Sequence, residues 1–177
     1  MSSAGPAAAG APNEATPNDP AALGPRVARL LTRVTWPGKP GEPAPAAPLT
    51  AAERQHFEAG QEVYRNVCQA CHQADGRGQD KLAPPLLGSA WALGRADIAA
   101  GILLHGKEGA IGLMPPIGAS FTDAQVADVL TYVRRAWGQA GAPVDAATVA
   151  SVRARTKDRT RPWTDADLKS FAAARNP

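Results

Sequence analysis

Cys68-Gln69-Ala70-Cys71-His72 is the stretch that decides the fold of this 177-residue chain. It holds the only two cysteines, and a histidine follows the second one directly. This order is the attachment signature of a c-type haem, in which each thiol forms a thioether bond with a haem vinyl group. His72 is then carried beneath the macrocycle, where an imidazole nitrogen binds the iron. The stretch therefore predicts one covalent haem c and a protein that moves single electrons.

Two other interpretations of the cysteine pair have different requirements. A thioredoxin-like dithiol needs a surrounding βαβ pattern, which this sequence does not show. A structural zinc site needs four ligands, usually including a second pair of Cys or His, whereas His56 and His105 are isolated. The haem is therefore the preferred interpretation, and a dithiol, a zinc site or a chance match stay as alternatives.

Met114 is expected to be the second axial ligand of the iron. It is the only methionine besides Met1, and it lies in the irregular loop Gly112-Leu113-Met114-Pro115-Pro116. A Met ligand raises the reduction potential relative to two His ligands. The alternatives are a core methionine that only fills space and His105 as the ligand. His56 is interpreted as an ordinary helical residue.

Helix signals frame the haem motif. Thr50-Ala51-Ala52-Glu53 has the form of a capping box, and apolar residues recur at helical spacing after it, so a helix is expected from about residue 51 to 70. Residues 109–120 are expected to be loop, and no β-strand alternation stands out. Further helices are expected at 96–104, from the capping box at 122–125 to 137, at 145–155, and from 164 onward.

Composition divides the chain into three regions. Residues 1–48 are an Ala/Pro-rich extension and linker with too little apolar periodicity to fold alone, and residues 49–138 are the haem domain. Residues 139–177 are a basic extension: within an overall net charge of +3, residues 153–177 hold seven Lys or Arg against three Asp. Both extensions are expected to bind a partner rather than contribute to the haem core, and the positive charge suits an acidic surface. A simply solvated basic face is the alternative.

Residues 50–138 resemble the class I c-type cytochromes. Besides the attachment motif, Pro84-Pro85-Leu86-Leu87-Gly88 is similar to the family's Pro-x-Leu-x-Gly segment, and Met114-Pro115 is similar to its methionine loop. The resemblance implies an all-α fold around the haem, with the Pro84 carbonyl accepting the Nδ1 hydrogen of His72. It also implies a crossing of the first and last core helices, at which Gly60 allows close approach.

Shorter matches point to a narrower group. Four short segments resemble cytochrome domains that are fused to, or paired with, bacterial propeller-type sugar or alcohol dehydrogenases, many of them quinoproteins: Trp36-Pro37-Gly38-Lys39, Gly88-Ser89-Ala90-Trp91, Leu130-Thr131-Tyr132-Val133-Arg134-Arg135 and Trp163-Thr164. The resemblance further implies that Trp91 and Arg95 lie near the haem edge, where either side chain could bond a propionate. A core Trp91 and a solvated Arg95 are the alternative.

The expected function is electron transfer rather than catalysis by this chain. The module would take single electrons from a dehydrogenase or a respiratory or photosynthetic complex and pass them to an acceptor. The alternatives are a haem enzyme or small-ligand sensor, which needs a labile sixth ligand, and a structural haem-bearing subunit of a larger complex. No basic surface interleaved with aromatics indicates nucleic acid.

The expected location is periplasmic or otherwise extracytoplasmic, because haem attachment of this type normally occurs outside the cytoplasm. No apolar run approaches the ~20 residues of a transmembrane helix, and residues 1–25 lack the charged and apolar regions of a signal peptide. The sequence therefore leads us to expect a mature form or an excised domain, with peripheral association with a membrane complex left open.

Overall fold

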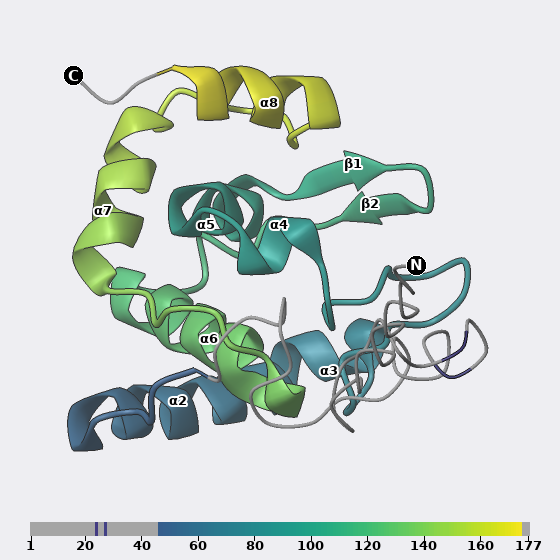
Figure 1. Ribbon diagram of the computed structural model, residues 1–177. Coiled ribbons are helices and arrows are strands. Elements are labelled where there is room, and N and C mark those ends of the chain that lie inside the picture. Colours follow the sequence, from purple (N-terminus) through teal and green to yellow (C-terminus); the bar gives the residue numbers. More distant parts are fainter. Residues whose placement is uncertain (1–23, 25–26, 28–45, 175–177) are drawn as a thin grey trace, which may run out of the picture. The chain divides into compact units, whose positions relative to one another are not determined.

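The computed structural model describes residues 24, 27 and 46–174. The chain divides into two compact units, residues 1–44 and 45–177, and all the elements below belong to the second. The prediction for residues 1–48 therefore falls mostly outside the described residues. The elements, labelled as in Figure 1, are α2 (Ala51–Val63), a π-helix (Tyr64–Cys68), α3 (Gln69–His72), α4 (Ala90–Leu93), α5 (Ala96–His105), β1 (Lys107–Gly109), β2 (Gly112–Met114), α6 (Asp123–Arg135), a 3₁₀ turn (Ala136–Gly138), α7 (Ala146–Arg155) and α8 (Asp165–Ala173).

The haem motif ends an unbroken helical run that starts at Ala51. The capping box is confirmed: the Thr50 side chain accepts from the Glu53 amide, and the Glu53 carboxylate accepts from the Thr50 amide at 2.8 Å. The run then widens to π geometry over Tyr64–Cys68 and closes with α3. π segments inside α-helices are frequent at functional sites, and this one ends at Cys68, the first residue of the motif.

Helix α2 crosses α6 at Gly60, and the predicted close approach is confirmed. A Cβ on Gly60 would lie 1.9 Å from the Asp128 carbonyl oxygen, which no side chain tolerates. Helix α6 starts at the predicted capping box, formed by Thr122 and Gln125. The crossing therefore fixes the helix that carries the haem motif against the most buried helix of the fold.

An aromatic cluster anchors the end of the helical run. Tyr64 is fully buried, with its ring 5.1 Å from that of Tyr132 and 5.4 Å from that of Trp137. Its hydroxyl donates to the Gln73 carbonyl at 2.6 Å, and the indole of Trp137 donates to the Ala74 carbonyl at 3.0 Å. The backbone directly after the motif, at Gln73 and Ala74, is thus held by side chains of the aromatic cluster.

A β-hairpin occupies residues 107–114 and so replaces the first part of the loop expected over residues 109–120. Strands β1 and β2 pair antiparallel, with Lys107 opposite Met114 and Gly109 opposite Gly112. Sequence reasoning missed them because each strand has three residues, too few to show alternation. Gly106 starts the hairpin at φ 76°, and a Cβ there would lie 2.5 Å from the Met114 carbonyl oxygen.

The C-terminal helices belong to the same core, so the expectation that residues 139–177 stay outside it is wrong. Val149 and Val152 of α7 are fully buried against α5 and α6, as members of a cluster with Ala100, Val126 and other apolar side chains. Trp163 and Leu168 are buried with Ile98 and Ile102 in another cluster. In Figure 1, α7 runs beside α5 and α6, and α8 lies above α5 and the hairpin. Helices α7 and α8 bury the apolar side chains of α5, which would otherwise be exposed to solvent.

The described elements otherwise confirm the all-α expectation, with the short hairpin as an addition. Within the part of the chain that the structure describes, no helix has both the length and the apolar character needed to cross a membrane.

Candidate haem site

His72 is oriented by the backbone of a loop that follows it. Its Nδ1 lies 3.1 Å from the carbonyl oxygen of Pro84, twelve residues further along the chain. A carbonyl oxygen only accepts, so Nδ1 carries the hydrogen and Nε2 is the nitrogen with a free lone pair. Among the described residues, Nε2 has no hydrogen-bond partner. The contact expected between His72 and Pro84 is therefore present, and it leaves one nitrogen ready to bind a metal.

Burial disfavours the protonated form of this imidazole. His72 is 7% exposed, and burial lowers its pKa, although the hydrogen bond to Pro84 opposes the shift. A neutral imidazole is the form that binds iron. The direction of the shift therefore favours the form of His72 that a metal needs.

The loop that supplies Pro84 is tied back to the motif at several points. The Gly78 amide donates to the His72 carbonyl at 3.0 Å, and the Gln79 amide donates to the Ala83 carbonyl at 2.9 Å. The Leu86 amide then donates to the Gly76 carbonyl at 2.8 Å. These bonds fold residues 76–86 into a compact loop, which places the Pro84 carbonyl beside the imidazole.

The two cysteines are free thiols on the same helical end. Cys68 is half-buried and Cys71 is exposed. Burial, with a smaller contribution from Cys71, raises the pKa of Cys68 to about 11. Covalent haem attachment requires two free thiols about one helical turn apart, followed by a histidine with a free ring nitrogen. Cys68, Cys71 and His72 form this donor set.

Met114 is the last residue of β2, and its side chain is half-buried against the cluster of Ile98, Ile102 and Trp163. After the two prolines, the Ile117 amide donates to the Leu103 carbonyl at 2.9 Å. The methionine therefore sits on a short segment that is paired with β1 on one side and bonded to α5 on the other.

Large apolar side chains are exposed next to these groups along the chain. Val67 precedes Cys68, Leu82 lies in the Pro84 loop, and Leu113 precedes Met114; they are 38%, 51% and 60% exposed. Each leaves apolar surface open to solvent beside a residue of the candidate site. The residues present therefore fit a haem, which is an apolar body with an iron that takes nitrogen and thioether ligands.

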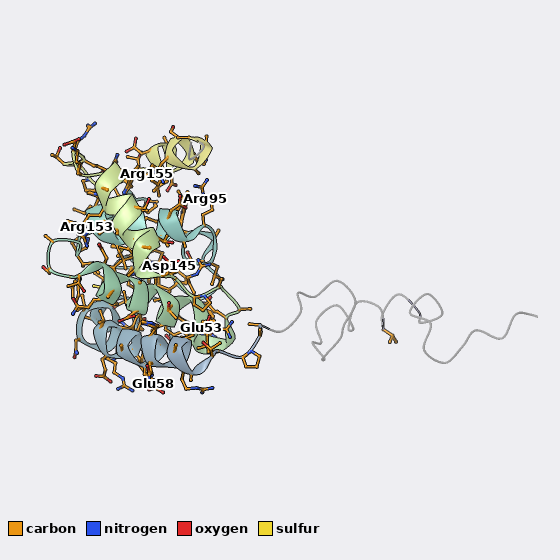
Figure 2. The ribbon with its side chains drawn as sticks, turned by 90° about the vertical axis from the view of Figure 1, so that its left-hand side faces the viewer. Glu53, Glu58, Arg95, Asp145, Arg153 and Arg155 are labelled. Atoms are coloured by element: carbon orange, nitrogen blue, oxygen red, sulfur yellow. The ribbon has the colours of Figure 1, made fainter. Side chains whose placement is uncertain are left out.

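Trp91 and Arg95 have different surroundings. Trp91 is half-buried beside Met114 in the cluster around Trp163, with the Lys107 ammonium 5.7 Å from its ring centroid. Arg95 forms hydrogen bonds with the Asp97 carboxylate at 2.6 and 3.0 Å and with the Ala172 carbonyl at 2.6 Å. Figure 2 shows Arg95 near Arg155, on the side of the C-terminal helices. Arg95 is thus engaged by the C-terminal region.

Arg134 positions α4, and sequence reasoning did not single it out. It is buried, and its guanidinium donates to the carbonyls of Ala92 at 2.7 Å, Gly94 at 2.8 Å and Ala142 at 2.7 Å. Burial lowers its pKa from a very high ordinary value. The bonds to Ala92 and Gly94 join α6 to the end of the helix that carries Trp91, and the bond to Ala142 holds the segment that follows α6. The only sequence signal is an Arg at a position of α6 whose neighbours are apolar.

The remaining histidines have protein partners. His105 Nε2 lies 2.7 Å from the Thr156 hydroxyl, and His56 Nδ1 lies 2.7 Å from the Asp128 carboxylate. No group of three or more His, Cys, Asp or Glu that could hold a metal occurs among the residues the structure describes. Neither geometry favours these histidines as haem ligands over Met114.

Residues 55–133 match the family described as cytochrome c oxidase, cbb3-type, subunit III. Those residues hold the attachment motif, the Pro84 loop and Met114. By this match they are similar to c-type cytochrome domains, a class whose cofactor is haem c.

Three relatives are cytochrome subunits. The chain is 38% identical over 116 residues to the gluconate 2-dehydrogenase cytochrome c subunit of Pantoea cypripedii, covering 58% of this chain and 25% of the relative. It is 36% identical over 110 residues to the fructose dehydrogenase cytochrome subunit of Gluconobacter japonicus, with coverage of 55% and 22%. It is 32% identical over 93 residues to the cytochrome c subunit of a quinone alcohol dehydrogenase of Gluconobacter oxydans (strain 621H), with coverage of 45% and 18%. The cytochrome domain and its flanks thus span a quarter or less of these relatives.

Proposed function

We propose that this chain is an electron carrier with one covalent haem c, and not itself a catalyst. The observation that carries the proposal is the end of the first helical run. There Cys68 and Cys71 are free, and His72 donates from Nδ1 to Pro84 while Nε2 stays unpaired. Two cysteines permit one such attachment in this chain. When bound, the haem supplies an iron that changes between the ferric and ferrous states.

The residues have separate tasks in this proposal. The thiols of Cys68 and Cys71 anchor the group, so that it does not exchange with solvent. The Pro84 carbonyl holds the tautomer and ring orientation of His72 and raises its basicity as a ligand. The buried aromatic cluster around Tyr64 keeps the helical end rigid. A rigid site needs little rearrangement when the charge on it changes, which favours fast electron transfer.

Met114 is the proposed second ligand. The hairpin presents a thioether from a segment that is fixed by hydrogen bonds before and after Pro115 and Pro116. A thioether opposite an imidazole raises the reduction potential relative to two imidazoles. With both positions filled, the site transfers electrons and leaves no place for a substrate.

The proposed electron donor is a sugar or alcohol dehydrogenase, or a complex that contains one. The support is that the three relatives are named as cytochrome subunits of gluconate, fructose and alcohol dehydrogenases. The location proposed is the periplasm or another extracytoplasmic space. The surplus of Lys and Arg in residues 153–177 suits an acidic partner surface, with an association rate that falls as salt rises.

The test is an absorbance spectrum of the dithionite-reduced protein, with and without carbon monoxide. A carrier with both positions filled shows the sharp low-spin bands of a c-type haem and does not change on adding the gas. A shift with carbon monoxide would instead show an open or labile position, as in a haem enzyme or ligand sensor. Reduction by a quinoprotein dehydrogenase, followed by stopped flow at increasing salt, tests the donor class.

A further inference from the structure

The chain segment around Trp163 lies against the hairpin that carries Met114 and joins it through a single parallel bridge. The Trp163 amide donates to the Gly106 carbonyl at 3.0 Å, and the Glu108 amide donates to the Trp163 carbonyl at 2.8 Å. These bonds make a parallel bridge between Lys107 and Trp163. Lys107 in turn lies opposite Met114 across the hairpin. A two-stranded hairpin is marginal by itself, so the added segment stabilises it.

The side chain of Trp163 fixes this segment to α5. It is 4% exposed, and its indole N–H donates to the Gly101 carbonyl at 2.8 Å. The ring packs in the cluster of Ile98, Ile102 and Leu168, against which the Met114 side chain also lies. Trp163 is therefore the residue through which α5, the hairpin and α8 meet.

The segment is itself held rigid from the C-terminal side. The Arg159 guanidinium carbon lies 3.6 Å from the centroid of the Trp163 ring, and Arg159 forms a 2.6 Å ion pair with Asp167. Asp167 closes the capping box of α8 with Thr164. The Lys107 ammonium lies 2.6 Å from the Asp165 carboxylate, which adds a contact between β1 and the start of α8.

We infer that Trp163 is a positioning residue for Met114, and that the C-terminal region locks the thioether in place as an axial ligand. This inference rests on the proposed function, because it takes Met114 as the ligand. It assigns to residues 139–174 a task in controlling ligand exchange at the iron. Without the lock, the hairpin would open locally at a lower free energy than the rest of the fold, and Met114 would leave the iron more often.

The experiment measures how fast imidazole, used as a competing ligand, displaces the native ligand from the ferric holoprotein. We expect Trp163→Ala to speed displacement roughly tenfold or more. A factor of ten corresponds to about 1.4 kcal/mol, and truncating a buried Trp typically removes more stability than that. Trp163→Phe, which keeps most of the ring but loses the indole N–H, should lie between. The reduction potential should fall in Trp163→Ala, and amide exchange at residues 107–114 should become faster.

Val149→Ala is the matched control. Val149 is fully buried in the C-terminal region but packs against α5 and α6 in the other cluster. If Val149→Ala speeds displacement and hairpin exchange as much as Trp163→Ala at equal loss of global stability, the effect is general loosening and the inference is wrong. Unchanged displacement in Trp163→Ala would also overturn it.

If the proposed function itself is wrong, the native protein gives a different result from the one that overturns the role of Trp163. If the native ferric protein lacks the near-infrared sulfur-to-iron band, Met114 is not the ligand, and the ligand-locking inference fails with that assignment. Amide exchange at residues 107–114 in Trp163→Ala then still shows whether Trp163 holds the hairpin.

Discussion

Gly60 of α2 and Asp128 of α6 meet backbone to backbone, so closely that a Cβ on Gly60 would lie 1.9 Å from the Asp128 carbonyl oxygen. The same Cβ would lie 3.0 Å from the Tyr132 Cβ. This contact sets the distance between the helix that carries the haem motif and the helix at the centre of the core.

Gly60→Ala is expected to destabilise the holoprotein by about 3 kcal/mol or more, because the helices have to separate to admit the methyl group. Urea unfolding followed by circular dichroism measures the loss. Gly109→Ala is the control, since its Cβ meets only the end of the flexible Lys107 side chain, at 3.4 Å. An equal loss in both variants would mean that the crossing has no special role.

One haem should stay attached after denaturation. The two thioether bonds expected at Cys68 and Cys71 are covalent, so acid–acetone extraction should leave the colour with the protein. Intact mass should exceed that of the polypeptide by one haem. The double variant Cys68→Ala, Cys71→Ala should lose its haem on extraction, and a native haem that extracts freely would contradict the assignment.

Met114→Ala should abolish the near-infrared sulfur-to-iron band of the ferric protein and lower the reduction potential, since a thioether favours the ferrous state. Spectroscopy and redox titration measure both. Leu113→Ala, one residue earlier and largely exposed, serves as the control and should keep the band. A band that persists in Met114→Ala would assign the ligand to another residue.

Removal of residues 144–177 should lower the melting temperature by about 10 °C or more, because it uncovers the apolar cluster of α5 and α6. It should also increase high-spin character in the ferric spectrum, because without the segment around Trp163 the Met114 ligand would leave the iron more often. Removal of residues 1–44, which lie outside the second compact unit, is the control and should leave both properties unchanged. Two equally stable truncated proteins would show that the C-terminal region is dispensable.

Burial, together with the charge of Arg159, lowers the pKa of His105. In the unfolded chain the imidazole takes up a proton near its ordinary pKa of about 6.5, whereas the folded protein resists protonation until lower pH. Protons therefore favour the unfolded state, and stability that is full above about pH 7 falls as the pH drops toward about 5.

His105→Gln should flatten this decline relative to the native protein, measured as the free energy of unfolding between about pH 5 and 8. Thr156→Val is the comparison: it removes the hydrogen bond of 2.7 Å to His105 but leaves the imidazole buried. It should lower stability at every pH and keep the slope. If the free energy of unfolding of His105→Gln declines with falling pH as steeply as that of the native protein, a group other than His105 causes the decline.

Signals contained within a few neighbouring residues were read correctly from the sequence. The spacing of Cys68, Cys71 and His72 defines the donor set by itself, because the chemistry lies in the side chains and one helical turn joins them. The capping boxes predicted at Thr50 and Thr122 follow from bonds between a hydroxyl and an amide three residues on, and the helix start predicted at 164 has the same kind of cap. The all-α expectation for residues 50–138 followed from such signals and from the family resemblance.

Contacts between distant parts of the chain were decided only by the tertiary structure. Arg134 reaches the carbonyls of Ala92 and Gly94, about forty residues away, and the local sequence does not indicate which carbonyls it binds. Trp163 forms backbone hydrogen bonds with Gly106 and Glu108, and nothing in the sequence around Trp163 indicates this bridge to a hairpin more than fifty residues earlier. Residues 139–174 look like a polar, basic tail because their few apolar side chains are widely spaced. Their place in the core depends on the apolar face that α5 leaves uncovered, which only packing in three dimensions creates.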